Sequence, residues 1–258
     1  MTRIASFAAA ALCVALCVSC ARAEKIEIPV PEGVDLAAAA EVRDAGNGLW
    51  LLDGPVAASR VIDAMHAAGG GTMTASVLEL VPVEQGEPLP GRTIEVTSSS
   101  DGAAFSAAIS VGDRSGEIVV VGDAVWLRGD AAFLASAGVV GGEEPGGAAD
   151  DEEFVCLSRG AASLSQLEAL ADPAEFLRTA LLGLEIGALE PAADSPGTQT
   201  LVLGSGGAPT GELVVESRGA PLPQRLFVAD QSGTVRAEFA WGGVDGIRPP
   251  RGAGEGCG

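Results

Sequence analysis

The sequence predicts an α+β fold, a strongly curved antiparallel sheet (a half-barrel of about 10–11 strands) with helices packed on its concave face. Short segments that alternate apolar and polar residues recur between turn residues, as in TMTASV at 72–77, which is typical of antiparallel strands. Two longer segments have helical periodicity, one before the first group of strands and one between the two groups. This order of elements indicates helices that cover one face of a single sheet.

The first helix is predicted to begin at Pro55, since proline is favoured in the first turn, and to end before the glycines at 69–71. Its apolar stripe consists of Val61, Ala64, Met65 and Ala68. Alternation then predicts a meander of five strands, at 72–77, 92–96, 103–110, 116–121 and 124–129.

An acidic, glycine-rich loop at 141–153 follows, and then a short strand at 154–158. The loop lacks the spaced ligands of a calcium-binding loop and is expected to be solvated. A helical segment is predicted over 163–184, with Asp172 placed to cap its second half. Strands are predicted to resume at 198–204, 211–217, 224–230, 234–240 and 244–247.

The chain begins with an export signal. Its apolar run at 4–18 suits a signal peptide and is shorter than the roughly 20 residues of a membrane-spanning helix. Val18-Ser19-Cys20 fits a lipobox, in which residues 1–19 are removed and Cys20 carries the lipid anchor. Ala21-Arg22-Ala23 instead fits an ordinary signal-peptidase site. We expect an extracytoplasmic protein anchored to the cell membrane by lipid or, alternatively, a secreted one.

Four parts follow from these patterns. The signal peptide covers 1–19, an anchor and tether cover 20–54, one domain covers 55–250, and a glycine-rich tail covers 251–258. The domain is long enough to bury a sizeable core.

Charge and cysteine usage limit the partners. Lysine and arginine number 15 against 35 aspartate and glutamate, a formal net charge of −20, which excludes nucleic acid as a partner and favours a neutral or basic ligand headgroup over a polyanionic one. We expect a monomer.

Outside the signal and Cys20, the chain keeps Cys156 and Cys257, an even pair that predicts a disulfide in an oxidising compartment. A buried thiol at 156 with a free thiol at 257 is the alternative.

Catalytic and metal sites are not expected. His66 is the single histidine and lies off the apolar stripe of its helix. The sequence contains no G-x-S-x-G motif to supply a serine nucleophile for which it could act as the base. The usual zinc ligands are missing as well. We therefore predict a protein that is not an enzyme and that needs no cofactor.

Four stretches form a more specific pattern: VGDAVWLRGDAAFL at 121–134, SLSQLEALADPAEFLRTAL at 163–181, SRGAPLPQRLFVA at 217–229 and FAWGGVDGIRPP at 239–250. In this order they resemble the LppX/LprA/LprG family of actinobacterial lipoproteins, which have a LolA-like fold. The resemblance implies a cavity that takes the acyl chains of a lipid or glycolipid, and a carrier role between envelope layers.

Small residues on the inner strand faces, such as Ala75, Ala104 and Ala107, would leave room for this cavity. The apolar residues predicted to line it are Val61, Met65, Phe105, Ile109, Phe133, Phe176, Leu181 and Leu184. The same residues could instead fill a dry core. The alternative function is an RseB-like envelope sensor, a LolA-like module that binds partner proteins without lipid cargo.

Overall fold

The computed structural model describes residues 46–81, 88–139, 153–158, 162–189, 197–205 and 208–251. The signal, the lipidation residue Cys20, the upstream part of the tether, the disulfide candidate Cys257 and most of the acidic loop lie outside the described residues. Their structural roles remain predictions.

One antiparallel sheet of eleven strands dominates the described part, in the order β6-β5-β4-β3-β2-β1-β11-β10-β9-β8-β7. The first group of strands is β1 Gly71–Val81, β2 Leu89–Ser100, β3 Ala104–Val111, β4 Arg114–Val121, β5 Ala124–Gly129 and β6 Val155–Ser158. The second group is β7 Ile186–Ala188, β8 Thr198–Ser205, β9 Ala208–Glu216, β10 Pro223–Asp230 and β11 Gly233–Trp241. The helices are η1 Leu49–Leu51, α3 Gly54–Ala67, α4 Ala131–Ser136, α5 Ala162–Ala171 and α6 Pro173–Leu181.

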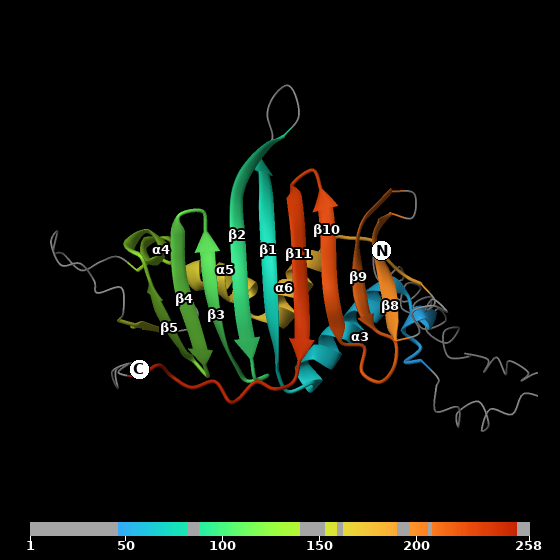
Figure 1. Ribbon diagram of the computed structural model, residues 1–258, viewed down its shortest axis with the longest axis horizontal. Helices are drawn as coiled ribbons and strands as arrows, with labels where there is room; N and C mark the ends of the chain where they lie inside the picture. Colours follow the sequence, from blue (N-terminus) through green and yellow to red (C-terminus); the bar gives the residue numbers. More distant parts are fainter. Residues whose placement is uncertain are drawn as a thin grey trace, which may run out of the picture. The chain divides into compact units, whose positions relative to one another are not determined.

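The two groups of strands meet at the centre of the sheet. There β1 pairs with β11, from Gly71 opposite Trp241 to Glu79 opposite Gly233. Each group then runs outward as a meander, which leaves β6 and β7 at the two edges. Because β6 precedes α5 and β7 follows α6, the chain passes from one edge to the other through these helices. Figure 1 shows α3, α5 and α6 on one face of the sheet.

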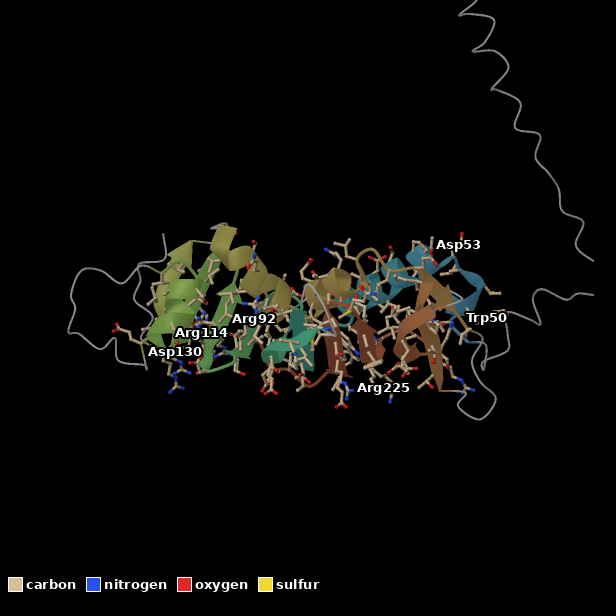
Figure 2. All side chains as sticks on the ribbon, turned by 90° about the horizontal axis from the view of Figure 1, so that it is seen from above. Trp50, Asp53, Arg92, Arg114, Asp130 and Arg225 are labelled. Atoms are coloured by element: carbon tan, nitrogen blue, oxygen red, sulfur yellow. The ribbon has the colours of Figure 1, made fainter. Side chains whose placement is uncertain are left out.

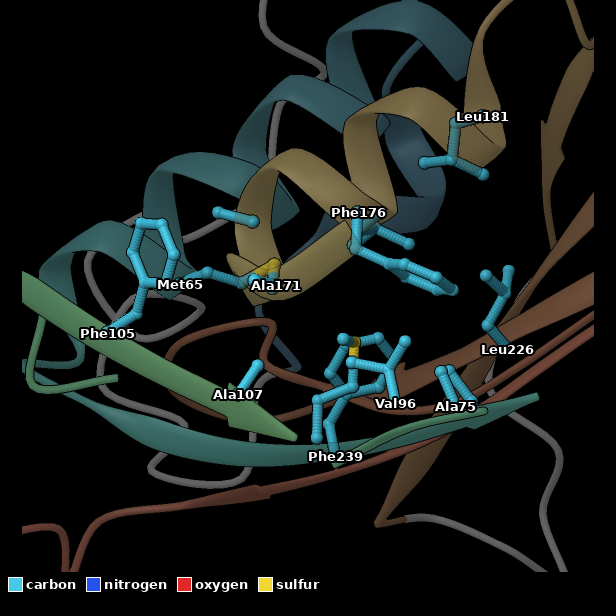
Figure 3. Close-up of a cluster of buried hydrophobic side chains, with 14 of the residues drawn as sticks. Met65, Ala75, Val96, Phe105, Ala107, Ala171, Phe176, Leu181, Leu226 and Phe239 are labelled. Carbon is cyan, nitrogen blue, oxygen red and sulfur yellow. The ribbon is translucent and has the colours of Figure 1, made fainter. Parts of the chain in front are cut away.

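That face is concave, since the strands curve around the helices (Figure 3). On β1, Met73 and Ala75 are buried while Thr72 and Thr74 are exposed, as alternation requires of a sheet with one covered face. Phe176 points from α6 toward the sheet, and Phe105 rises from β3 beside Met65 of α3 (Figure 3). The predicted curved antiparallel sheet with helices on its concave face is confirmed.

The predicted helical segment over 163–184 consists of two helices that meet at Asp172. The Asp172 carboxylate accepts hydrogen bonds from the backbone N–H groups of Ala174, at 2.8 Å, and Glu175, at 3.3 Å. These are N–H groups that have no partner within the helix, so Asp172 caps α6 as predicted.

Residues upstream of 55 belong to the packed fold. Leu49 is buried, and Asn47 donates from its side-chain amide to the backbone carbonyl of Glu216 at 2.8 Å. The fold therefore includes residues from 46 onward, upstream of the domain start that the sequence predicts.

The predicted strand at 244–247 is wrong. Both edges of β11 are already paired, with β1 and β10, so no free edge is available next to it. The chain instead continues without regular structure past the strand ends (Figure 1). The backbone N–H of Ile247 donates to the Asp101 carboxylate at 2.8 Å. This bond fixes the C-terminal segment to the turn between β2 and β3.

Candidate functional site

A cavity of about 330 Å³ lies between the concave face and helices α5 and α6. Its floor comes from β1, β2 and β11, and its roof from the two helices. Most of its lining side chains are apolar: Val77, Ile94 and Val235 from the sheet, with Ala169, Leu170, Phe176 and Ala180 from the helices. The volume falls at the low end of the roughly 300–1,000 Å³ typical of small-molecule sites.

A second cavity, of about 130 Å³, adjoins the first beneath α4 and α5. Four residues line both cavities: Arg92, Ile94, Gln166 and Leu170. Since Gln166 and Leu170 belong to α5, side chains of this helix stand between the two spaces.

Charged residues mark the rim of the larger cavity. Arg92 lies two residues before Ile94 on β2, and Glu79 lies two residues after Val77 on β1, so strand alternation places both on the inner face. Their side chains form a two-point ion pair, with Nε to Oε2 at 2.6 Å and a terminal guanidinium nitrogen to Oε1 at 2.9 Å. The hydrogen bond to Glu79 and its negative charge raise the pKa of Arg92 above its ordinary value. The pair is open to solvent, since the side chains are 60% and 40% exposed.

Arg114, at the start of β4, contributes a second guanidinium at the smaller cavity. The oxygens of the nearby Asp130 accept hydrogen bonds from the backbone N–H groups of Ser115, at 2.5 Å, and Phe133, at 2.8 Å. These two bonds, helped by the charge of Arg114, lower the pKa of Asp130. Within the described part of the chain, Arg114 has no ion-pair partner. Figure 2 shows Arg92, Arg114 and Asp130 toward the same end of the sheet.

Phe133 forms one wall of the smaller cavity because two glycines let it approach the sheet. A Cβ at Gly116 would lie 2.2 Å from its ring, and one at Gly129 would lie 2.9 Å from it. The ring therefore lies against bare backbone of β4 and β5.

The residues predicted to line a cavity fall into two groups. Phe176 lines the larger cavity and Phe133 the smaller one. The others lie in or against the packed core: Val61, Met65, Phe105, Ile109 and Leu181 are buried, and Leu184 is partly buried against them. Met65 also borders a small gap of about 30 Å³ beside α6.

Other predicted features have definite positions. His66 is exposed on α3, and Cys156 lies on β6 opposite Trp126 of β5. In the described ranges no three His, Cys, Asp or Glu side chains are grouped to hold a metal ion. None of the helices in those ranges has the length and apolar character needed to cross a bilayer.

Comparisons with known proteins give matches to solved structures at low sequence identity. No protein-family model matches the chain, and no curated protein does. The structure of LprF from Mycobacterium bovis aligns at 13% identity and a TM-score of 0.31, covering 78% of this chain and 99% of LprF. The LolA superfamily protein NE2245 from Nitrosomonas europaea aligns at 12% identity and a TM-score of 0.30, covering 71% of this chain and 91% of that one.

The second of these belongs to the superfamily whose fold the sequence resemblance predicts. Alignments at such scores carry no argument about ligand or role, which must come from the chain's own residues.

The sequence prediction missed the charged rim. Glu79, Arg92 and Arg114 were not singled out, although the first two interrupt an apolar alternation at one end of their strands. A charged residue at an inner-face position is the signal that could have found them, because such a group must reach solvent or a partner.

Proposed function

We propose that this protein is an extracytoplasmic lipid-binding protein that holds an acyl chain in the cavity beneath α5 and α6. The observation that carries the proposal is the cavity itself, an apolar space of about 330 Å³ on the covered face of the sheet with one charged rim. Apolar surface removed from water there would supply the binding energy, at about 25 cal/mol per Å² before the costs of association. The resemblance to LppX/LprA/LprG-type lipoproteins supports the same function.

The proposal includes a membrane anchor at Cys20, with the residues between it and 46 as a tether, and a carrier role between envelope layers. A domain held near a bilayer by a flexible segment can reach the lipids of that bilayer. Cleavage after Ala23 would instead give a diffusible carrier, and the intact mass of the mature protein distinguishes the two.

Filling the cavity tests the function. Ala180 of α6 lines the cavity, so we expect Ala180→Phe to occupy space that an acyl chain needs. Ala67, an exposed residue at the end of α3, provides a matched control as Ala67→Phe. Displacement of a fluorescent fatty acid should show binding weakened about tenfold or more by Ala180→Phe and unchanged by Ala67→Phe. Full binding by a folded Ala180→Phe variant, checked by circular dichroism, would contradict the proposal.

A further inference from the structure

We infer that the ligand of this cavity is a single-chain lipid with an anionic head, which Arg92 and Arg114 bind at the rim. The inference rests on the proposed function and adds to it the chemistry of the ligand.

The charge at the rim is opposite in sign to that of the whole chain. The formal net charge of the protein is −20, yet the charged residues that line the two cavities are Arg92, Arg114 and Glu79. Two guanidinium groups and one carboxylate line the rim, and although the nearby Asp130 carboxylate offsets part of this charge, the lining itself is locally positive. It thus favours an anionic head, contrary to the preference for neutral or basic heads expected from net charge alone.

Arg92 already binds a carboxylate in the geometry that a lipid head would use. Its two contacts with Glu79 are the paired N–H to oxygen bonds of a guanidinium–carboxylate fork. Because the pair is exposed to water, exchanging one carboxylate for another costs little. An incoming carboxylate or phosphate can therefore replace Glu79 at Arg92 while the attached chain enters the apolar space beside it.

Arg114 supplies the second contact. No ion pair to Arg114 is formed among the described side chains; the nearby Asp130 interacts with it by charge, while both Asp130 oxygens accept hydrogen bonds from backbone N–H groups. Arg92 lines both cavities and Arg114 lines the smaller one. A lipid head group bound between the two arginines would place its acyl chain under α5.

The volume limits the number of chains. The larger cavity, about 330 Å³, is at the lower limit for drug-sized ligands, and the second adds about 130 Å³. This space suits one acyl chain better than the several chains of a triacylglyceride or glycolipid.

The test compares four probes that share one chain: palmitate, cetyl phosphate, cetyl alcohol and cetylamine. We expect palmitate and cetyl phosphate to bind about tenfold or more tightly than the alcohol, and the amine to bind least. Arg92→Gln and Arg114→Gln should each lower the affinity for palmitate about tenfold while leaving the affinity for cetyl alcohol unchanged. Glu79→Gln should raise the affinity for palmitate, because it removes the competing carboxylate.

Arg225→Gln is the matched control. Arg225 pairs with Glu212 at 3.1 Å, and these side chains are 58% and 42% exposed, close to the values of the rim pair. Figure 2 places Arg225 on the side of the sheet away from the helices. This variant should leave all four affinities unchanged.

The outcomes separate the two proposals. Equal binding of acid and alcohol, or loss of palmitate with Arg225→Gln as large as with Arg92→Gln, would overturn the anionic-head inference while lipid binding stands. Failure of all four probes to bind would overturn the proposed function itself.

Discussion

Replacing Gly116 by alanine should destabilise the protein by about 2 kcal/mol, because the added methyl group meets the Phe133 ring. An ideal Cβ there would lie 2.2 Å from two carbons of that ring and 2.7 Å from the carbonyl oxygen of Arg128. Ordinary contacts for such atoms are 3.4–4 Å, so a neighbour must move by more than 1 Å. The Arg128 carbonyl belongs to the paired strand β5 and must also shift, so the change strains the strand pairing as well as displacing the ring.

Phe133 has little room to do so. Its side chain is 1% exposed, and the adjacent free space is the smaller cavity that it lines. The ring must therefore either strain the core or move into that cavity. Both responses predict a lower free energy of unfolding, and the second also predicts weaker lipid binding.

Urea unfolding followed by circular dichroism measures the effect, as a lower midpoint at an unchanged slope. Gly187→Ala is the control, since Gly187 lies in β7 with nothing within 4 Å of an added Cβ. It should change stability by no more than about 0.5 kcal/mol. In the double variant Gly116→Ala with Phe133→Leu, the loss in free energy of unfolding should be at least about 1 kcal/mol smaller than the sum of the losses in the two single variants. Strict additivity, or equal effects of Gly116→Ala and Gly187→Ala, would refute the close approach.

Two further predictions concern capping and pH. Asp172→Ala removes the cap of α6 and should lower the free energy of unfolding by about 1 kcal/mol in the same urea assay, an effect that Asp172→Asn should largely avoid. The backbone N–H of Ile247 lowers the pKa of Asp101, so this contact stabilises the fold above the ordinary pKa of aspartate and is lost as pH falls through the lowered value. The hydrogen-exchange protection factor of Ile247 should therefore fall in acid, and an unchanged factor would contradict the role of Asp101.

Much of the fold could be predicted from residue patterns because its elements are locally encoded. Alternating strands such as β1, and the Asp172 cap that separates α5 from α6, each carry a signal within a few residues. Helix α4 and strand β7 were not predicted. They have six and three residues, too few for a periodic pattern to emerge.

Other features depend on contacts that the local sequence does not contain. The sequence predicts a strand at 244–247, yet both edges of β11 are already paired. Ala104 was expected to leave inner space, but alternation places it on the opposite side of β3 from Phe105 and Ala107.

The candidate site shows the same limit. Apolar character identified Phe133 and Phe176, which line the cavities, but could not separate them from Val61 or Ile109 in the packed core. Which apolar side chains border empty space depends on how α5 lies across the sheet. That is set by the whole chain rather than by any one segment.

The central claim is that the cavity under α5 and α6 holds a lipid chain. Native mass spectrometry of the protein released gently from its own membrane tests it most directly. We predict a bound species with the mass of a single-chain anionic lipid, present in the parent protein and missing from Ala180→Phe. A parent protein that carries no lipid, and that takes up none when palmitate is offered, would contradict the claim.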